Sequence, residues 1–337
     1  MRRLVAAGVI ALTVTVAACG TDGVAVEEPI PDLFEDEADV VAEETTTSST
    51  TTTTIPVAER LPALAADVPG VVVTPTGVVA PLIEPTPVGW RVLTPCRAVV
   101  GVEAGTQVAA AHVVIDPGHG GSETGAVGAG GLTEAALNLD VAQRTAAALE
   151  AQGVSVVLTR TTDIRMPLTT RADIARSVGA QAFVSIHHNA DPDGPSEEPG
   201  TEVWYQIDDP ESRRLSGLVY EEAVGSIGGL GADWVADDDA GVKYRLNQRG
   251  TDYYGILRES VGVPAALAEL AFLSNPAEEA LLATDEYRDS VAAAVADGII
   301  RFLVTPDEGS GFVEPYERVE PAGSGGGSAG CVDPALG

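Results

Sequence analysis

The sequence predicts an α/β domain with a mixed, mostly parallel twisted sheet and helices on both faces. From about residue 111 to residue 304, short apolar runs rich in β-branched residues alternate with longer helical patterns. Such alternation is typical of strand–helix–strand units. The regions on either side differ: residues 19–65 are acidic and rich in Thr, and residues 305–337 are rich in Pro, Gly and Ser. The acidic and Thr-rich region cannot bury enough apolar surface to offset chain entropy.

The composition excludes a basic binding surface. The chain has 337 residues, 45 % of them hydrophobic and 4 % aromatic, and a formal net charge of −31. A chain this acidic does not bind nucleic acid or an anionic membrane through a basic patch. We expect one medium-sized, monomeric domain with appendages.

The first residues resemble a bacterial lipoprotein signal. Arg2 and Arg3 precede an apolar stretch that ends at Ala18 and is too short for a permanent membrane helix. Small residues stand directly before Cys19, which predicts cleavage of residues 1–18 and a lipid on the thiol. An ordinary secretory signal is the alternative. In both cases we expect the mature chain outside the cytoplasm, with residues 19–65 as a disordered tether from the outer face of the membrane.

An oxidising compartment also changes how the other cysteines are interpreted. Cys96 and Cys331 are the two that remain, and our hypothesis is that they form a disulfide. The bridge would hold the Gly/Ser tail against the folded part of the chain.

The elements follow in order along the chain. Residues 66–108 contain short apolar runs separated by Pro and Gly, which predicts a small β appendage. Asn275 and Pro276 are typical of the cap and first position of a helix. The main elements expected in residues 111–304 are strands 113–115, 154–158, 183–186, 201–206 and 265–272, and helices 134–152, 168–178, 212–227, 253–260 and 285–303.

Three of the four histidines follow predicted strands. His119 lies in a Pro/Gly turn, and His187 and His188 end a later strand. Ligands of α/β sheets bind beyond the carboxyl ends of the strands. Glu134 begins a helix, whose positive end favours an ionised carboxylate. Two imidazoles and a carboxylate leave a fourth position open, which is typical of catalytic zinc. Neighbours on a strand point to opposite faces, so only one of His187 and His188 can bind, and spacing does not decide which. His112 has no such context and is expected at the surface or a strand edge.

Four motifs resemble the zinc-dependent N-acetylmuramoyl-L-alanine amidases of the third amidase family. They are Val-Ile-Asp-Pro-Gly-His-Gly-Gly, Leu-Thr-Glu-Ala-Ala-Leu-Asn-Leu, Ser-Ile-His-His-Asn-Ala and Glu-Leu-Ala-Phe-Leu-Ser-Asn, and they occur in the family's order within residues 113–303. The resemblance implies a cell-wall hydrolase whose zinc is held by His119, Glu134 and His187. It also implies that Glu269 is catalytic. The family commonly has a small residue where His188 stands.

The implied reaction is hydrolysis of the peptidoglycan amide between the lactyl group of N-acetylmuramic acid and L-alanine. Glu269 would be the general base beside the zinc. The alternatives are a zinc carboxypeptidase or endopeptidase acting within the stem peptide, and an inactive wall-binding regulator. Some family members have a blocking helix and need a protein activator. Residues 237–241 favour a loop over such a helix.

Other residues near the motifs have open roles. Arg249, His188 and Asn189 are candidate substrate-binding residues; a salt bridge is the alternative for Arg249, and an exposed polar position is the alternative for His188. Asp116 is a candidate to orient His119 from behind, or else it stabilises the turn before Pro117. The last two candidates, which we expect in structural ion pairs, are Arg160 and Arg171.

Overall fold

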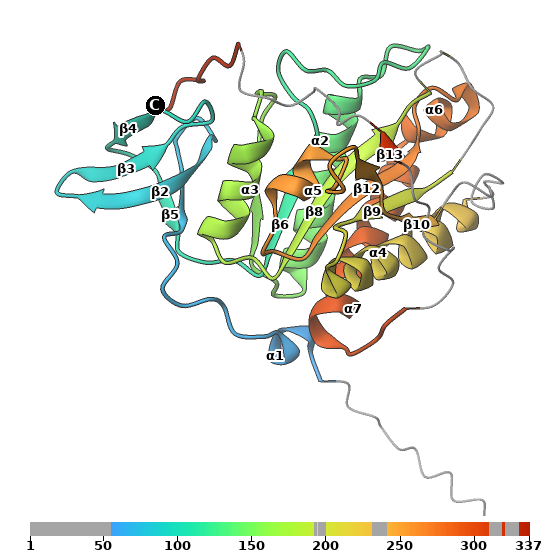
Figure 1. Ribbon diagram of the computed structural model, residues 1–337, viewed down its shortest axis with the longest axis horizontal. Helices are drawn as coiled ribbons and strands as arrows, with labels where there is room; N and C mark the ends of the chain where they lie inside the picture. The colour runs from blue at the N-terminus through green and yellow to red at the C-terminus, as the bar shows by residue number, and fades with distance from the viewer. Residues whose placement is uncertain (1–54, 192–193, 195–199, 231–240, 310–318, 321–329) are drawn as a thin grey trace, which may run out of the picture. The chain divides into compact units, whose positions relative to one another are not determined.

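A six-stranded sheet forms the centre of the computed structural model, with strands in the order β10-β9-β12-β8-β6-β7 (Figure 1). The structure describes residues 55–191, 194, 200–230, 241–309, 319–320 and 330–337. Strands β6, β7, β8 and β12 are parallel, β9 is antiparallel to β12, and β10 is parallel to β9. The predicted mixed, mostly parallel sheet is therefore confirmed. Its strands are β6 (Val113–Pro117), β7 (Val156–Leu158), β8 (Ala182–Asn189), β9 (Glu202–Tyr205), β10 (Gly241–Lys243) and β12 (Ala265–Phe272).

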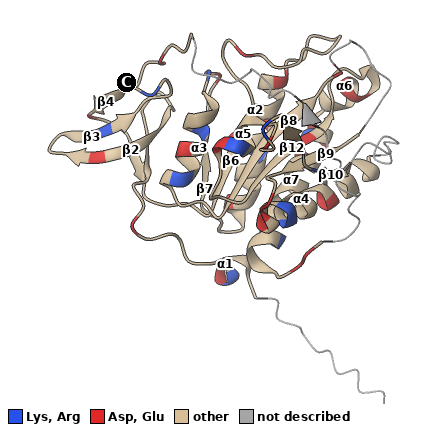
Figure 2. Cartoon of the chain, in the orientation of Figure 1, with Lys and Arg blue, Asp and Glu red and all other residues tan. Residues whose placement is uncertain are grey.

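Helices cover both faces of this sheet. Alternate residues along a strand point to opposite faces, so Val113 and Ile115 enter one core and Val114 enters the other. Figure 2 shows that charged residues lie mainly on helices and loops, whereas the strands of this sheet are largely uncharged. The first core lies under α2 (Glu134–Ala151), α4 (Pro210–Gly229) and α7 (Asp285–Val304), and the second under α3 (Leu168–Ser177) and α5 (Gly255–Glu259).

A short helix, α6 (Pro276–Leu282), follows β12. The side chain of Asn275 accepts hydrogen bonds from the backbone N–H groups of Ala277 and Glu278, and Pro276 occupies the first turn. Both features agree with the predicted start of a helix, because Pro lacks the N–H that the first turn leaves unpaired.

The predicted β appendage is an antiparallel sheet in the order β4-β3-β2-β1-β5. It lies beside α3, where Thr170 Oγ1 donates to Pro95 O at 2.8 Å and Gly70 N donates to Ser177 O at 2.7 Å. These two hydrogen bonds help to hold the appendage against the main domain. Its strands are β1 (Val71–Val73), β2 (Val79–Thr86), β3 (Gly89–Leu93), β4 (Val99–Val102) and β5 (Thr106–Val108).

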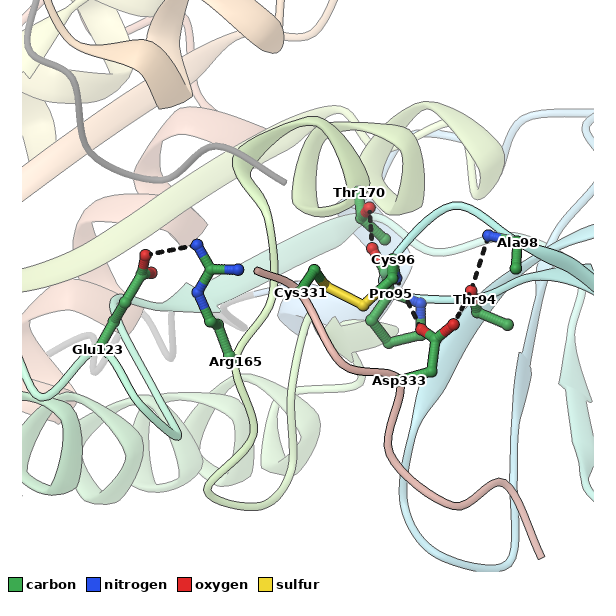
Figure 3. Close-up of a disulfide and its surroundings, with 9 residues drawn as sticks. All are labelled: Thr94, Pro95, Cys96, Ala98, Glu123, Arg165, Thr170, Cys331 and Asp333. Atoms are coloured by element: carbon green, nitrogen blue, oxygen red, sulfur yellow. Dashed lines mark hydrogen bonds and ion pairs between the residues drawn. A yellow bond between two sulfur atoms is a disulfide. The ribbon is translucent and has the colours of Figure 1, made fainter. Parts of the chain in front are cut away.

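The end of the chain returns to this small sheet. Cys96 and Cys331 form a disulfide with a Cα–Cα distance of 5.6 Å (Figure 3). The carboxylate of Asp333 accepts hydrogen bonds from Thr94 Oγ1 and from the backbone N–H of Cys96. In the described part of the tail beyond α7, β13 (Val319–Glu320) pairs with β11 (Leu246–Asn247) of the main domain.

The folded region begins earlier than residue 66, where the sequence analysis ended the tether. Residues Val57–Arg60 form α1, and Arg60 Nη2 donates to Val304 O at 2.8 Å. Nε2 of His112 lies 3.1 Å from Pro62 O, which buries this histidine at a strand edge instead of leaving it on the surface. Residues 55–65 therefore pack on the domain through contacts with residues far along the chain, which composition does not reveal.

Several predictions concern residues outside the described ones. The signal, the lipid on Cys19 and most of the tether fall in residues 1–54, and four of residues 237–241 are also outside. The fifth, Gly241, begins β10. In the part of the chain that the structure describes, no helix is long and apolar enough to cross a membrane.

Candidate active site

Three predicted metal ligands meet at the carboxyl edge of the parallel strands. His119 follows β6, His187 lies near the end of β8, and Glu134 is the first residue of α2. Nε2 of His119 lies 3.1 Å from Glu134 Oε2, and Nδ1 of His187 lies 2.9 Å from Glu134 Oε1. All three ligand atoms lie within 4.8 Å of one another. The structure therefore brings together residues that are up to 68 positions apart in the sequence, from 119 to 187.

This group fits a zinc ion. Donor atoms about 2.0–2.1 Å from a tetrahedral zinc ion lie roughly 3.3 Å apart, close to the contacts observed here. Burial raises the pKa of Glu134, but hydrogen bonds from His119 and His187 outweigh it and hold the pKa well below its usual range. Burial lowers the pKa of His187. An ionised carboxylate and a neutral imidazole are the forms that bind a cation.

The backbone conformation around His119 and two nearby glycines leave room for the three candidate ligands. His119 has φ +58°, a left-handed conformation that is uncommon outside glycine and clusters at functional sites. A Cβ on Gly118 would lie 2.2 Å from Nε2 of His187. A Cβ on Gly125 would lie 2.3 Å from Glu134 Oε2. Glycine at these two positions therefore leaves the space that the ligands occupy.

Two buried arginines hold the turn that carries His119. Arg160 donates to the carbonyls of Pro117 and Gly118 at 2.9 and 2.8 Å. Arg171 donates to the carbonyls of Pro117 and His119, both at 2.6 Å. Neither side chain is exposed by more than 2 %, and both are held by backbone carbonyls of this turn. Only Arg171 is in the expected structural ion pair; Arg160 binds carbonyl oxygens, because its guanidinium ends among the backbone groups of the turn.

Asp116 does not contact His119, which corrects one of its two predicted roles. Its carboxylate accepts hydrogen bonds from Ser185 Oγ at 2.7 Å, from Thr159 Oγ1, and from Arg171 Nη1 at 2.7 Å. Burial raises the pKa of Asp116, but the charge of Arg171 and these hydrogen bonds outweigh it and leave the pKa below its usual value. Asp116 thus acts on the turn through Arg171, which in turn holds the His119 carbonyl.

Glu269 lies beside the candidate ligands. It stands on β12 opposite His187 of β8 and opposite Glu202 of β9. Its Oε2 is buried and has no hydrogen-bond partner among the described residues. Burial, followed by the charges of Glu134 and Glu202, raises the pKa of Glu269 well above its usual value. A carboxyl group with one unused oxygen and a raised pKa suits proton transfer at this position.

The carboxylate next to Glu269, that of Glu202, was not predicted from the sequence. Glu202 Oε1 pairs with Nζ of Lys243 at 2.6 Å, and Glu202 Oε2 accepts a hydrogen bond from Asn189 at 2.8 Å. Lys243 is the single lysine of the chain, a signal that could have drawn attention to it. Asn189, a predicted substrate-binding residue, is therefore engaged with Glu202.

His188 does not line a groove, nor is it an exposed polar residue. The alternation along β8 turns its side chain to the face opposite His187, where it is 1 % exposed. Its Nδ1 lies 2.8 Å from Asn138 Oδ1. Arg249, in the turn after β11, is exposed, and no described contact places its side chain at the ligand group.

A cavity of about 480 Å³ opens beside His119 and His187. Residues 122–125 form one wall, and Met166 and Leu168 form another. The ion pair between Glu123 Oε1 and Arg165 Nη2, 2.8 Å long, joins the two walls (Figure 3). This volume is typical of small-molecule sites. These lining residues carry no motif, so the sequence alone gave them no role.

Comparisons with known proteins agree with this geometry. Residues 113–301 match the family described as N-acetylmuramoyl-L-alanine amidase. The chain is 32 % identical over 216 residues to an uncharacterized Bacillus subtilis protein, YqiI, a match that covers 62 % of this chain and 95 % of YqiI.

Two further matches are to named amidases. N-acetylmuramoyl-L-alanine amidase AmiC of Neisseria meningitidis serogroup B is 32 % identical over 223 residues, 57 % of this chain and 53 % of AmiC. This chain thus spans about half the length of AmiC. The crystal structure of N-acetylmuramoyl-L-alanine amidase from Clostridium difficile 630 aligns with a TM-score of 0.51 and 31 % identity, covering 59 % of this chain and 100 % of that one.

Proposed function

Because the chain belongs to the N-acetylmuramoyl-L-alanine amidase family, we propose that it is a zinc-dependent peptidoglycan hydrolase with Glu269 as its general base. The bond cleaved is the amide between the lactyl group of N-acetylmuramic acid and L-alanine. One observation carries the mechanism: the unpartnered Oε2 of Glu269 lies buried on the strand next to His187. A carboxyl oxygen without a partner is available to a water molecule at that place.

Zinc binding and proton transfer fall to different residues of the chain. His119, Glu134 and His187 would hold the zinc ion, which when bound polarises the scissile carbonyl and makes water more acidic. Glu269 accepts a proton from the attacking water and returns it to the leaving nitrogen of L-alanine. The C–N bond breaks, the lactyl group becomes a carboxylate, and the stem peptide leaves with a free amine.

The raised pKa of Glu269 is consistent with this role. A general base works best when its pKa is near the working pH, because it must both accept and release the proton. Burial next to Glu134 and Glu202 moves the pKa of Glu269 upward from the ordinary value of a glutamate. The cavity beside the ligands, about 480 Å³, would receive the part of the substrate next to the scissile bond.

A digestion experiment tests this function. Purified peptidoglycan would be treated with the wild-type protein and with Glu269→Gln, and the new chemical ends would be identified by mass spectrometry. The wild type should release stem peptides that begin with a free L-alanine amine, leaving lactyl carboxylates on the glycan. Glu269→Gln keeps the shape of the side chain, so it should bind zinc and lose about 10²–10⁴-fold in rate.

Two outcomes would contradict the proposal in different ways. New ends within the stem peptide would instead identify a zinc carboxypeptidase or endopeptidase. Cleavage by Glu269→Gln at the wild-type rate would show that another group accepts the proton.

We also propose that the mature chain is attached through a lipid on Cys19 to the outer face of the cell membrane. The small residues before Cys19 support this attachment, and the Cys96–Cys331 disulfide supports export of the chain, since such bonds persist in oxidising compartments. Metabolic labelling with a fatty acid should mark the wild type and not Cys19→Ser. A labelled Cys19→Ser protein would contradict the proposed attachment site.

A further inference from the structure

A row of three buried polar side chains, joined by hydrogen bonds, runs from the core to the carboxylate of Glu134. Asn138 on α2, His188 on β8 and Tyr287 on α7 are each exposed by 1 % or less. Asn138 Nδ2 lies 3.2 Å from Glu134 Oε1. Nδ1 of His188 lies 2.8 Å from Asn138 Oδ1, and Nε2 of His188 lies 3.3 Å from the hydroxyl of Tyr287. Three separate elements thus contribute to one connected row.

The partners fix the direction in which hydrogen bonds are donated. Asn138 Nδ2 also faces the carbonyl of Gly118 at 3.4 Å, so the amide nitrogen lies between two groups that only accept. The amide oxygen must then face His188 and accept a proton from its Nδ1. Nε2 of the neutral ring is left to accept from the hydroxyl of Tyr287. Donation therefore runs from Tyr287 to His188, to Asn138, and then to Glu134.

These polar groups lie where the core is otherwise apolar. Leu137, Val141 and Val291 belong to the same core, and each is fully buried. Burying a polar group costs free energy unless its hydrogen bonds are made, so a partly connected row would be costly. Each side chain of the row has a hydrogen-bond partner on the next one. The row ends on the carboxylate of Glu134, which the two candidate histidine ligands also contact. Asn138 is the one side chain outside the ligand group with a described hydrogen bond to Glu134.

We propose that Asn138, His188 and Tyr287 are positioning residues that orient the Glu134 carboxylate and thereby strengthen zinc binding. Two backbone N–H groups, of Ala126 and His188, also donate to this carboxylate. They constrain its oxygens from the turn and from β8, whereas the side-chain row holds the carboxylate from the core. The inference rests on the proposed zinc site and adds residues that act on it without touching the ion.

Zinc affinity measures this role directly. The dissociation constant of the wild type and each variant would be determined by competition with a chromophoric chelator, and the folding of each metal-free protein by its thermal midpoint. Tyr287→Phe removes only the hydroxyl, and His188→Ala removes the ring. Each should raise the dissociation constant about tenfold, as losses of such outer partners do. His188→Asn retains a donor near the position of Nδ1 and should recover most of the affinity.

Tyr220→Phe is the matched control. Tyr220 is also a buried tyrosine of the same core, on α4, and is not part of the row. Its substitution should leave zinc affinity unchanged.

The outcomes separate this inference from the proposed function. If Tyr287→Phe and His188→Ala bound zinc as tightly as the wild type and differed only in thermal midpoint, the residues would be structural and the inference wrong. If the wild type itself bound no zinc, the proposed function would fail, and the inference with it. A tenfold loss in both variants, with recovery in His188→Asn, would support the inference.

Discussion

Arg171→Met would test how far the buried ion pair supports the turn that carries His119. Arg171 and Asp116 are 2 % and 1 % exposed, and their charged atoms are 2.7 Å apart. The variant leaves the Asp116 carboxylate buried without its countercharge and takes donors from the carbonyls of Pro117, His119 and Met166. Removing one partner of a buried pair costs about 3–5 kcal/mol. For a domain of this size that cost lowers the melting temperature by roughly 6–20 °C.

Urea unfolding at pH 7 would measure the free energy of unfolding. Arg176→Met is the matched control on the same helix: Arg176 is 41 % exposed and pairs with Asp173, so its loss should cost less than about 1 kcal/mol. Because the folded-state pKa of Asp116 is lowered, the stabilisation by the pair is present above about pH 4 and is lost as the pH falls further. Equal effects of the two substitutions at pH 7 would refute the reasoning.

Two other predictions concern stability. Burial raises the pKa of Glu278 to about 8 from 4.5, so the wild type should lose stability as the pH rises through this range, because the folded state resists ionisation. Glu278→Gln should therefore melt at a higher temperature than the wild type at pH 9 and at a similar one at pH 4; a constant difference at both would contradict this. Replacing Cys96 and Cys331 with serine removes a cross-link between residues 235 positions apart and should cost about 2–4 kcal/mol. Reductant should lower the melting temperature of the wild type and not of this variant, and an equal response of both would count against a structural role of the disulfide.

The strand–helix order was predictable because its signals are local. The β-branched run at Val113–Ile115 and the helix cap at Asn275 depend on neighbouring residues only, and both elements form where expected. His119, Glu134 and His187 were identified because each follows such a signal and matches a family motif. The sequence could place them at one edge of the sheet, and the structure then gives the distances between them.

Side-chain direction and long-range contacts were less predictable. Whether His187 or His188 faces the site depends on which face of β8 is covered by α2 and α7, and the strand pattern is the same in either case. Arg160 donates a hydrogen bond to the carbonyl of Pro117, 43 residues away in the sequence. The spacing of residues along the sequence does not reveal such a contact. Residues 55–65 pack on the domain through contacts with residues far along the chain, such as Arg60 with Val304 and Pro62 with His112, which a local pattern does not reveal.

We propose that zinc held by His119, Glu134 and His187 is needed to cleave the amide next to the lactyl group. The most direct measurement follows the metal content and the peptidoglycan products of the mature protein before and after chelation. We expect about one zinc per chain before chelation. Chelation should remove the metal and stop the release of stem peptides beginning with L-alanine, and adding zinc should restore both. Unchanged release of those peptides from metal-free protein would contradict it.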